Sequence, residues 1–334
     1  MEQRARVVAF KTVTVSREDL EAMLGALRAE TSDPRAGLYG PGSMTWRVNR
    51  EAVILLGGGR AALLQLAHPF VAHAIDQHSA TKTDPIGRFQ RTFQNVFAMV
   101  FGDLDRAEEH ARRVHAVHSR IRGAIDEHVG PYARGERYAA NDEAALFWVQ
   151  ATLIDTALQV HEQLVRPLTP AERERYYAES RRFARLFGIP DRAMPPDFGA
   201  FRDYVDGMLH GTTLAVGRPA LELRRFLLQP PRAVHAPMTA WYRAYTASLL
   251  PPRLREAFEL PFGRREQLAL AATVPAVRAM VRRLPKRLRY FPDYVEAVRR
   301  TRGLPHRDRI GRALEQLALE AIRPDPSLLA PRRG

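Results

Sequence analysis

The residues of this sequence most able to do chemistry lie between positions 84 and 123, in a stretch predicted to form two consecutive amphipathic helices. The second helix, expected to run to Gly123, carries His118 where its apolar stripe would otherwise hold an aliphatic side chain. Steps of three and four residues define this stripe, whose members are Leu104, Ala107, Ala111, Val114, His118, Ile121 and Ile125. A histidine on an inward face is most often a hydrogen-bonded core residue, and otherwise a candidate metal ligand.

Three polar residues are predicted to lie near His118 and favour the ligand interpretation. Arg122 follows it by one helical turn, while Arg88 and Thr92 share one flank of the preceding helix. A hairpin of the two helices would bring all four residues within reach of one pocket. Imidazole binds iron and guanidinium groups bind carboxylates, so the combination suits a haem with its propionates.

The composition restricts the other kinds of site. The 334-residue chain has no cysteine, which excludes disulfides, iron–sulfur clusters, thiolate haem ligands and thiol nucleophiles. Signatures of di-iron proteins, zinc hydrolases and esterases are also absent from the sequence. The formal net charge is +14, and all but three of the 51 basic residues are arginine. Because they are spread along the whole chain, they could attract nucleic acid or anionic lipid but specify neither, and we predict no specific nucleic-acid partner.

A glycine-rich run containing Gly57 and Gly59 follows an apolar segment and imitates the fingerprint of a dinucleotide-binding unit. Such a unit needs alternating strands and helices, and no such alternation follows in the sequence. The glycines are instead expected to let the helix that starts near Arg60 pack closely against a neighbour or a flat ligand. Pro69 should kink or restart that helix, and His68 before it is a core histidine or a cofactor contact.

Apolar periodicity, Pro or Gly breaks and caps such as Ser16, Asp103 and Thr169 predict helices along almost the whole chain, with no credible run of paired strands. The predicted fold is therefore all-α, a multi-helix bundle. We expect an N-terminal arm and helix over 1–45, a main helical domain over 46–263, and C-terminal helices with a polar tail on the same domain over 264–334. The amino terminus lacks a signal-peptide core, and the longest apolar region, 52–75, is interrupted by polar residues. From these features we expect a cytoplasmic protein without a transmembrane segment. The sequence does not specify its oligomeric state.

A set of linked motifs, taken in order, resembles a known enzyme family. The motifs are Gly57-Gly-Gly-Arg60-Ala, Gln65-Leu-Ala-His68-Pro69, His78-Ser79, Asp84-Pro85-x-x-Arg88-x-x-x-Thr92, Phe101-Gly102-Asp103, Val117-His118-x-x-Ile121-Arg122-Gly123, Tyr138-x-Ala140-x-Asp142 and Trp148-Val149. Over roughly residues 46–263 the chain is similar to the rubber oxygenases, or latex-clearing proteins, and to the MpaB enzyme of mycophenolic acid biosynthesis. The resemblance implies a globin-like helical core around a b-type haem, and cleavage of isoprenoid carbon–carbon double bonds with dioxygen.

The resemblance also implies roles for individual residues. His118 matches the proximal ligand of the haem iron, and Arg122 matches the arginine one turn after that ligand. Arg88 and Thr92 match the arginine and threonine of the family's pocket. The expected cofactor-binding residues are His118, Arg122, Arg88, Gly59 and His68, and the expected catalytic residues are Arg88 and Thr92.

Two positions differ from the rubber oxygenases. Before Thr92 those enzymes carry a lysine, whereas this chain carries Arg91, which cannot lose its proton to ligate iron. Their distal carboxylate has no clear counterpart in this chain, where Asp76 is the nearest acidic residue. We therefore expect a haem b oxygenase that acts with dioxygen on a small apolar substrate, of which an isoprenoid is one candidate. Two alternatives stay open: a non-catalytic haem-binding sensor or carrier, and a basic helical protein that binds anionic partners.

Overall fold

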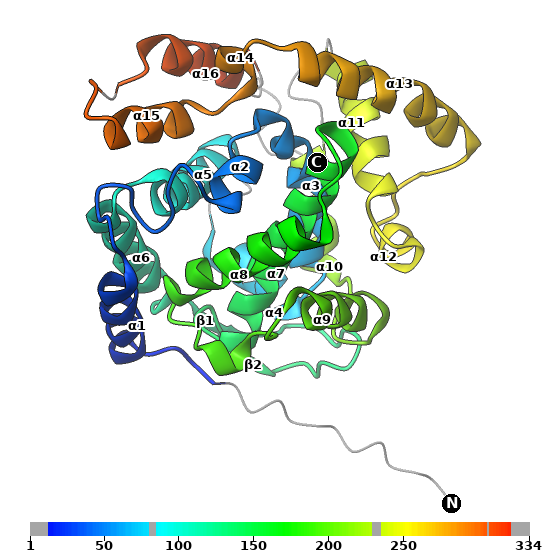
Figure 1. The fold of residues 1–334 in the computed structure, drawn as a ribbon. Coiled ribbons are helices and arrows are strands. Elements are labelled where there is room, and N and C mark those ends of the chain that lie inside the picture. The colour runs from blue at the N-terminus through cyan, green and yellow to red at the C-terminus, as the bar shows by residue number, and fades with distance from the viewer. Residues whose placement is uncertain (1–12, 80–84, 229–234, 306, 322–334) are drawn as a thin grey trace, which may run out of the picture.

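The structure is a computed structural model that describes residues 13–79, 85–228, 235–305 and 307–321, without the side chains of residues 85, 86, 88–90, 318, 319 and 321. It is 70% helical and, in the described ranges, has one small two-stranded sheet, which confirms the all-α prediction (Figure 1). The first helices are α1 (Arg17–Glu30), α2 (Met44–Asn49), the 3-10 helix η1 (Ala52–Gly57), α3 (Gly58–Leu66), α4 (Pro69–His78), α5 (Pro85–Phe101), α6 (Leu104–His118), α7 (Glu143–Leu164) and α8 (Pro170–Arg185). The remaining helices are η3 (Asp191–Ala193), α9 (Phe198–His210), α10 (Arg218–Leu228), α11 (Ala236–Ser248), α12 (Pro252–Ala257), α13 (Arg264–Arg283), α14 (Lys286–Arg289), α15 (Pro292–Thr301) and α16 (Arg309–Ala321).

Side-chain caps start several of these helices where the sequence predicts them. Ser16 caps α1 and forms a capping box with Asp19, since each side chain bonds the other residue's backbone N–H. Asp103 caps α6 by accepting a hydrogen bond from the backbone of Arg106, and Thr169 caps α8. These local contacts fix the starts of the two helices, α1 and α6, that border the candidate site.

The apolar run before the glycines forms the 3-10 helix η1 and leads directly into α3. A dinucleotide-binding unit would need a strand here, so the structure agrees with its rejection. Pro69 restarts the chain as α4, which is bent by 101° from the preceding helical segment. Within the described ranges, no helix taken singly has the length and apolarity to cross a bilayer, although the bent pair Ala52–Leu66 and Pro69–His78 meets both criteria together.

Helix α7 lies at the centre of the fold, with α2, α3, α8 and η1 packed around it (Figure 1). Its side chains are buried on nearly every side, which explains why its sequence is apolar all round instead of in one stripe. Trp148 of α7 donates a hydrogen bond from Nε1 to the carbonyl of Leu64 in α3 over 2.9 Å. A second core joins α2 to α5, where Trp46 donates from Nε1 to the carbonyl of Val100 over 2.8 Å.

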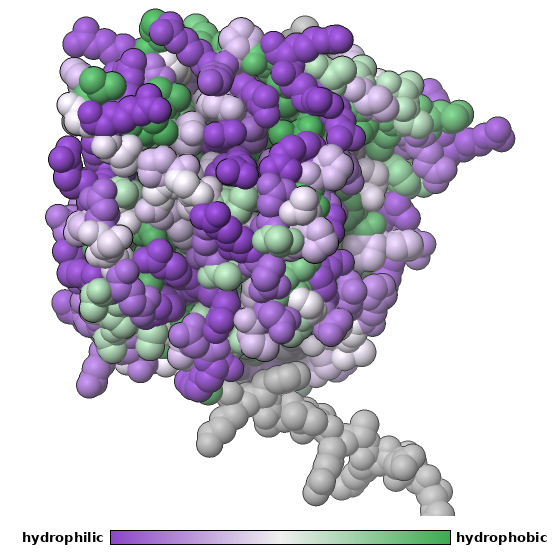
Figure 2. Space-filling model, viewed as in Figure 1, coloured by the Kyte–Doolittle hydropathy of each residue, from purple (hydrophilic) through white to green (hydrophobic). Residues whose placement is uncertain are grey.

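The surface in Figure 2 is mainly hydrophilic on the visible face. Hydrophobic residues gather at its upper right, over the region of α13, where Leu268 and Met280 are exposed.

One sequence prediction was wrong at the end of the helical hairpin. Helix α6 ends at His118, and the chain then forms β1 (Arg122–Ala124), which pairs antiparallel with β2 (Arg137–Ala139). Gly123 lies opposite Tyr138, whose ring leaves no room for a Cβ at that position. The apolar spacing continued through Ile125 because that residue also packs inward, but in a separate cluster with Tyr138 and Phe70. Helical spacing alone could not distinguish these two kinds of burial.

Candidate active site

His118 is the last residue of α6 and borders a cavity of about 670 Å³. The side chain is half-buried, and Arg122 lines the same cavity although it is exposed. The structure therefore brings these two predicted residues together, through a turn and the start of β1 instead of through one more helical turn. Val15, Leu20 and other residues near the start of α1 also line the cavity.

The structure places the other predicted residues of the hairpin differently. Thr92 is exposed on α5 and is not among the described residues that line the cavity. Arg91 beside it is exposed too. Arg88 belongs to α5, but its side chain lies outside the described part of the chain. Its pocket role and that of Thr92 stay predictions.

His115 is a lining residue that was not predicted from the sequence. It lies one turn before His118, it is buried, and its Nε2 donates a hydrogen bond to the carbonyl of Val15 over 3.2 Å. The spacing was the signal that could have found it, because two histidines three residues apart on a helix share a face.

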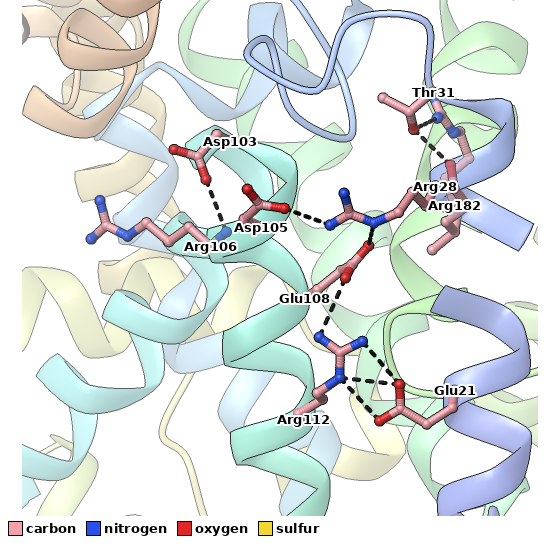
Figure 3. A network of polar contacts seen from close by, with 10 residues as sticks. Glu21, Arg28, Thr31, Asp103, Asp105, Arg106, Glu108, Arg112 and Arg182 are labelled. Atoms are coloured by element: carbon pink, nitrogen blue, oxygen red, sulfur yellow. Dashed lines mark hydrogen bonds and ion pairs between the residues drawn. The ribbon is translucent and has the colours of Figure 1, made fainter. Parts of the chain in front are cut away.

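Helix α6 is held against α1 by a network of charged side chains (Figure 3). Buried Glu108 accepts hydrogen bonds from Nε of Arg28 over 2.8 Å and from Arg112 over 3.3 Å. Arg112 also binds Glu21 of α1, at distances of 2.9–3.1 Å, and this hydrogen bonding lowers the pKa of Glu21. The network fixes the position of the helix that carries His118.

Replacing Glu108 with alanine should lower the free energy of unfolding by about 1–3 kcal/mol, because two arginines would lose a buried carboxylate while keeping access to solvent. Urea unfolding followed by circular dichroism measures the change. Glu109→Ala is the matched control, since Glu109 pairs with Arg113 at the exposed surface, and we expect a change below about 0.5 kcal/mol. Equal effects of the two substitutions would contradict this account of the network.

Two further predicted cofactor residues have packing roles in the structure. His68 is the N-cap of α4, where its Nδ1 accepts a hydrogen bond from the backbone of Phe70 over 3.3 Å. Burial lowers its pKa to about 4. Gly59 packs against α11, as a Cβ there would lie 2.5 Å from Oγ1 of Thr246 and 2.9 Å from the hydroxyl of Tyr242. This confirms the expected close packing, whereas contact of His68 and Gly59 with a cofactor stays a prediction.

Gly59→Ala should therefore lower the free energy of unfolding by about 1–3 kcal/mol, because the added methyl group overpacks the contact with α11. Gly25→Ala in α1 is the matched control, since a methyl group at that position would have no other atom within 4 Å. There the helix propensity of alanine should raise stability by up to about 1 kcal/mol. Thermal unfolding of both variants tests the difference in sign.

Among the described residues, one group has the composition of a metal site. His73, Asp126 and Glu127 each offer a ligand atom, and these atoms lie within 4.8 Å of one another. Nδ1 of His73 donates to the carbonyl of Pro69 over 2.9 Å, so its Nε2 points to the carboxylates, 3.0 Å from Asp126. The sequence analysis did not predict this group, because the two carboxylates lie some fifty positions from His73 in the chain.

A cation of the protein already occupies the outer side of this group. Arg218 lies 2.6 Å from Asp126, and its backbone N–H donates to Glu127 over 2.9 Å. Burial acts to raise the pKa of Asp126, but hydrogen bonding to His73 and the charge of Arg218 outweigh it, so the pKa lies below its usual value. We interpret the group as an ion-pair network that joins α4, the loop after β1 and α10.

Comparison with known proteins agrees with the resemblance seen in the sequence. The family model for the ER-bound oxygenase mpaB/B'/rubber oxygenase catalytic domain matches residues 46–279. Uncharacterised proteins of Mycobacterium bovis and Mycobacterium tuberculosis are each 29% identical to the chain over 181 residues, which cover 51% of this chain and 69% of the relative. No solved structure matches significantly.

Proposed function

Because the chain belongs to the mpaB/rubber oxygenase catalytic-domain family, we propose that it is a haem b-dependent oxygenase that acts with dioxygen on a small apolar substrate. The observation that carries the haem proposal is the shared cavity of His118 and Arg122 at the end of α6. The substrate class comes from the resemblance to enzymes of isoprenoid cleavage. The cytoplasmic location expected from the sequence stays a prediction.

The donor set at the cavity fits a haem. An imidazole is the ligand expected of a chain without cysteine, and His118 presents one at the edge of a cavity of about 670 Å³. Haem propionates need cationic partners, and Arg113 and Arg122 both line this cavity. Val15 and Leu20 supply apolar surface.

Individual residues of this chain would have the following roles. His118 would hold the iron, and Arg122 would bind a propionate through its guanidinium group. Arg88 and Thr92 would donate hydrogen bonds to the bound ligand, a role that rests on the family resemblance. When bound, the haem would supply the redox chemistry with dioxygen. The network around Glu108 would keep α6, and with it the imidazole, in a fixed position.

Isotope labelling tests the reaction. Protein expressed with a haem precursor would be incubated with squalene, an isoprenoid alkene, under labelled dioxygen, and the products analysed by mass spectrometry. We expect labelled carbonyl products from the wild type and none from His118→Ala. A haem-loaded protein that consumes no dioxygen with squalene or shorter isoprenoids would favour a sensor or carrier and contradict the oxygenase assignment.

A further inference from the structure

A second cavity, of about 410 Å³, lies where α2 and the two residues after it, the end of α7, α13 and α14 meet. It is separate from the cavity of His118, because no described residue lines both. In Figure 1, α13 and α14 lie at the opposite end of the view from β1, which carries Arg122. Six arginines line this second cavity: Arg47, Arg50, Arg166, Arg278, Arg282 and Arg289.

The arginines outnumber the carboxylates that neutralise them. Glu51, which is buried in the cavity wall, binds Arg289 through both oxygens at 2.6 and 2.9 Å. Glu172 binds Arg166 at 2.6 Å and Arg47 more distantly at 3.3 Å. The cavity therefore keeps a strong excess of positive charge, which attracts anions.

Two arginines of α13 have no carboxylate partner in the described part of the chain. Arg278 and Arg282 are one helical turn apart, and both line the cavity. The Nε atom of Arg278 is shielded from solvent and has no hydrogen-bond partner among the described residues. A buried guanidinium N–H without a hydrogen-bond acceptor costs free energy, and a bound ligand that accepts this hydrogen bond would recover it.

His161 of α7 shows the same unmet hydrogen-bonding capacity in the cavity wall. Its side chain is 2% exposed, and its Nδ1 has no hydrogen-bond partner among the described residues. Burial lowers the pKa of His161 to about 4, and the charge of Arg166 acts in the same direction. The ring is therefore neutral near pH 7 and carries one N–H. A hydrogen bond to the backbone of Arg166 competes for that proton, which an anionic ligand in the cavity would attract to Nδ1.

From this combination we propose that the cavity binds a phosphate group carried by an organic molecule, with Arg278, Arg282 and His161 as its donors. A phosphate monoester offers a double negative charge and several oxygens, which suits donors that approach from more than one helix. The space exceeds that of a phosphate group alone, and Val165 and Pro167 in the wall provide apolar contacts for the organic part. The source is either a free phosphorylated metabolite or a phospholipid headgroup.

Neighbouring contacts hold part of this site in place before any ligand binds. The guanidinium of Arg50 stacks over Tyr290 at 4.5 Å and donates to the hydroxyl of Tyr294 over 3.1 Å. Arg289 is fixed by Glu51, as described above, and its hydrogen bonding to that carboxylate raises its pKa. A preformed cationic wall reduces the ordering cost of binding.

Isothermal titration calorimetry with glycerol 3-phosphate tests the proposal on the full chain. We expect the wild type to bind, and the double variant Arg278→Gln/Arg282→Gln to bind at least about ten-fold more weakly, because charge-assisted hydrogen bonds are lost. Arg264→Gln/Arg283→Gln is the matched control. It removes the same charge from α13 at exposed positions outside the cavity, and should retain wild-type affinity.

A second experiment, with lipid vesicles, distinguishes the two sources of the phosphate group. The protein would be floated with phosphatidylcholine vesicles that either contain or lack phosphatidic acid. If the natural ligand is a lipid headgroup, the wild type should float only with the vesicles that contain phosphatidic acid. If the ligand is a soluble metabolite, it should float with neither. A protein that bound neither glycerol 3-phosphate nor phosphatidic acid would overturn the proposal. Equal losses in the cavity variant and its control would also overturn it, because they would indicate general surface charge. His118→Ala should bind like the wild type, so this result does not depend on the haem proposal.

Discussion

Replacing Asp155 with alanine is expected to lower the free energy of unfolding by about 3–5 kcal/mol. Asp155 is 1% exposed in the core of α7, and its two oxygens lie 2.6 Å from Arg60 and 2.5 Å from Arg202. The substitution would leave the guanidinium of Arg60, also 1% exposed, without a counter-charge. Burial already lowers the pKa of Arg60, and the nearby Asp155 carboxylate opposes that effect.

Urea unfolding followed by helical circular dichroism measures this loss. Asp206→Ala is the matched control, because it removes the other carboxylate near Arg202, which lies 3.6 Å away at the exposed surface. We expect the control to change stability by less than about 0.5 kcal/mol. If Asp155→Ala were within about 1 kcal/mol of the wild type, the buried pair would not hold α3 against α7 as described.

Replacing His118 with alanine is expected to reduce the haem content of the purified protein at least about ten-fold, because the only protein ligand that we assign to the iron is lost. The fold should persist, since the side chain is only half-buried at the end of α6. The measurement is haem per chain by the pyridine haemochrome method, with circular dichroism as a check on folding.

His210→Ala is the matched control for this variant. His210 is also the last residue of a helix, α9, but it is exposed and outside both cavities. Its haem content should equal that of the wild type. A His118→Ala protein that retained full haem content would show that another residue ligates the iron, and His115, one turn earlier and in the same cavity, would be the first candidate.

Much of the fold was predictable because its signals are local. The caps at Ser16, Asp103 and Thr169 and the restart at Pro69 depend on residues within one turn of each other, and the structure confirms all four. The end of α6 was not predictable from the same evidence. It depends on the pairing of Gly123 with a strand fourteen or more positions later, which apolar spacing cannot reveal.

The candidate site was predictable only in part, for the same reason. The sequence placed His118 and Arg122 in one pocket, and the structure shows them lining one cavity. It did not reveal the partners that meet through long-range contacts. Glu108 joins α6 to α1, Asp126 meets His73, and the arginines of the second cavity come from α2, α13, α14 and the chain just after α2 and α7. Such groups are assembled by the fold and leave no pattern in any one segment.

The absorption spectrum of the wild-type protein, expressed with a haem precursor and purified without added haem, tests the central claim most directly. We predict a Soret band and a haem content near one per chain, with a b-type pyridine haemochrome spectrum. A folded, helical protein with no Soret band, either as purified or after titration with haemin, would contradict the assignment of His118 as a haem ligand and with it the proposed function.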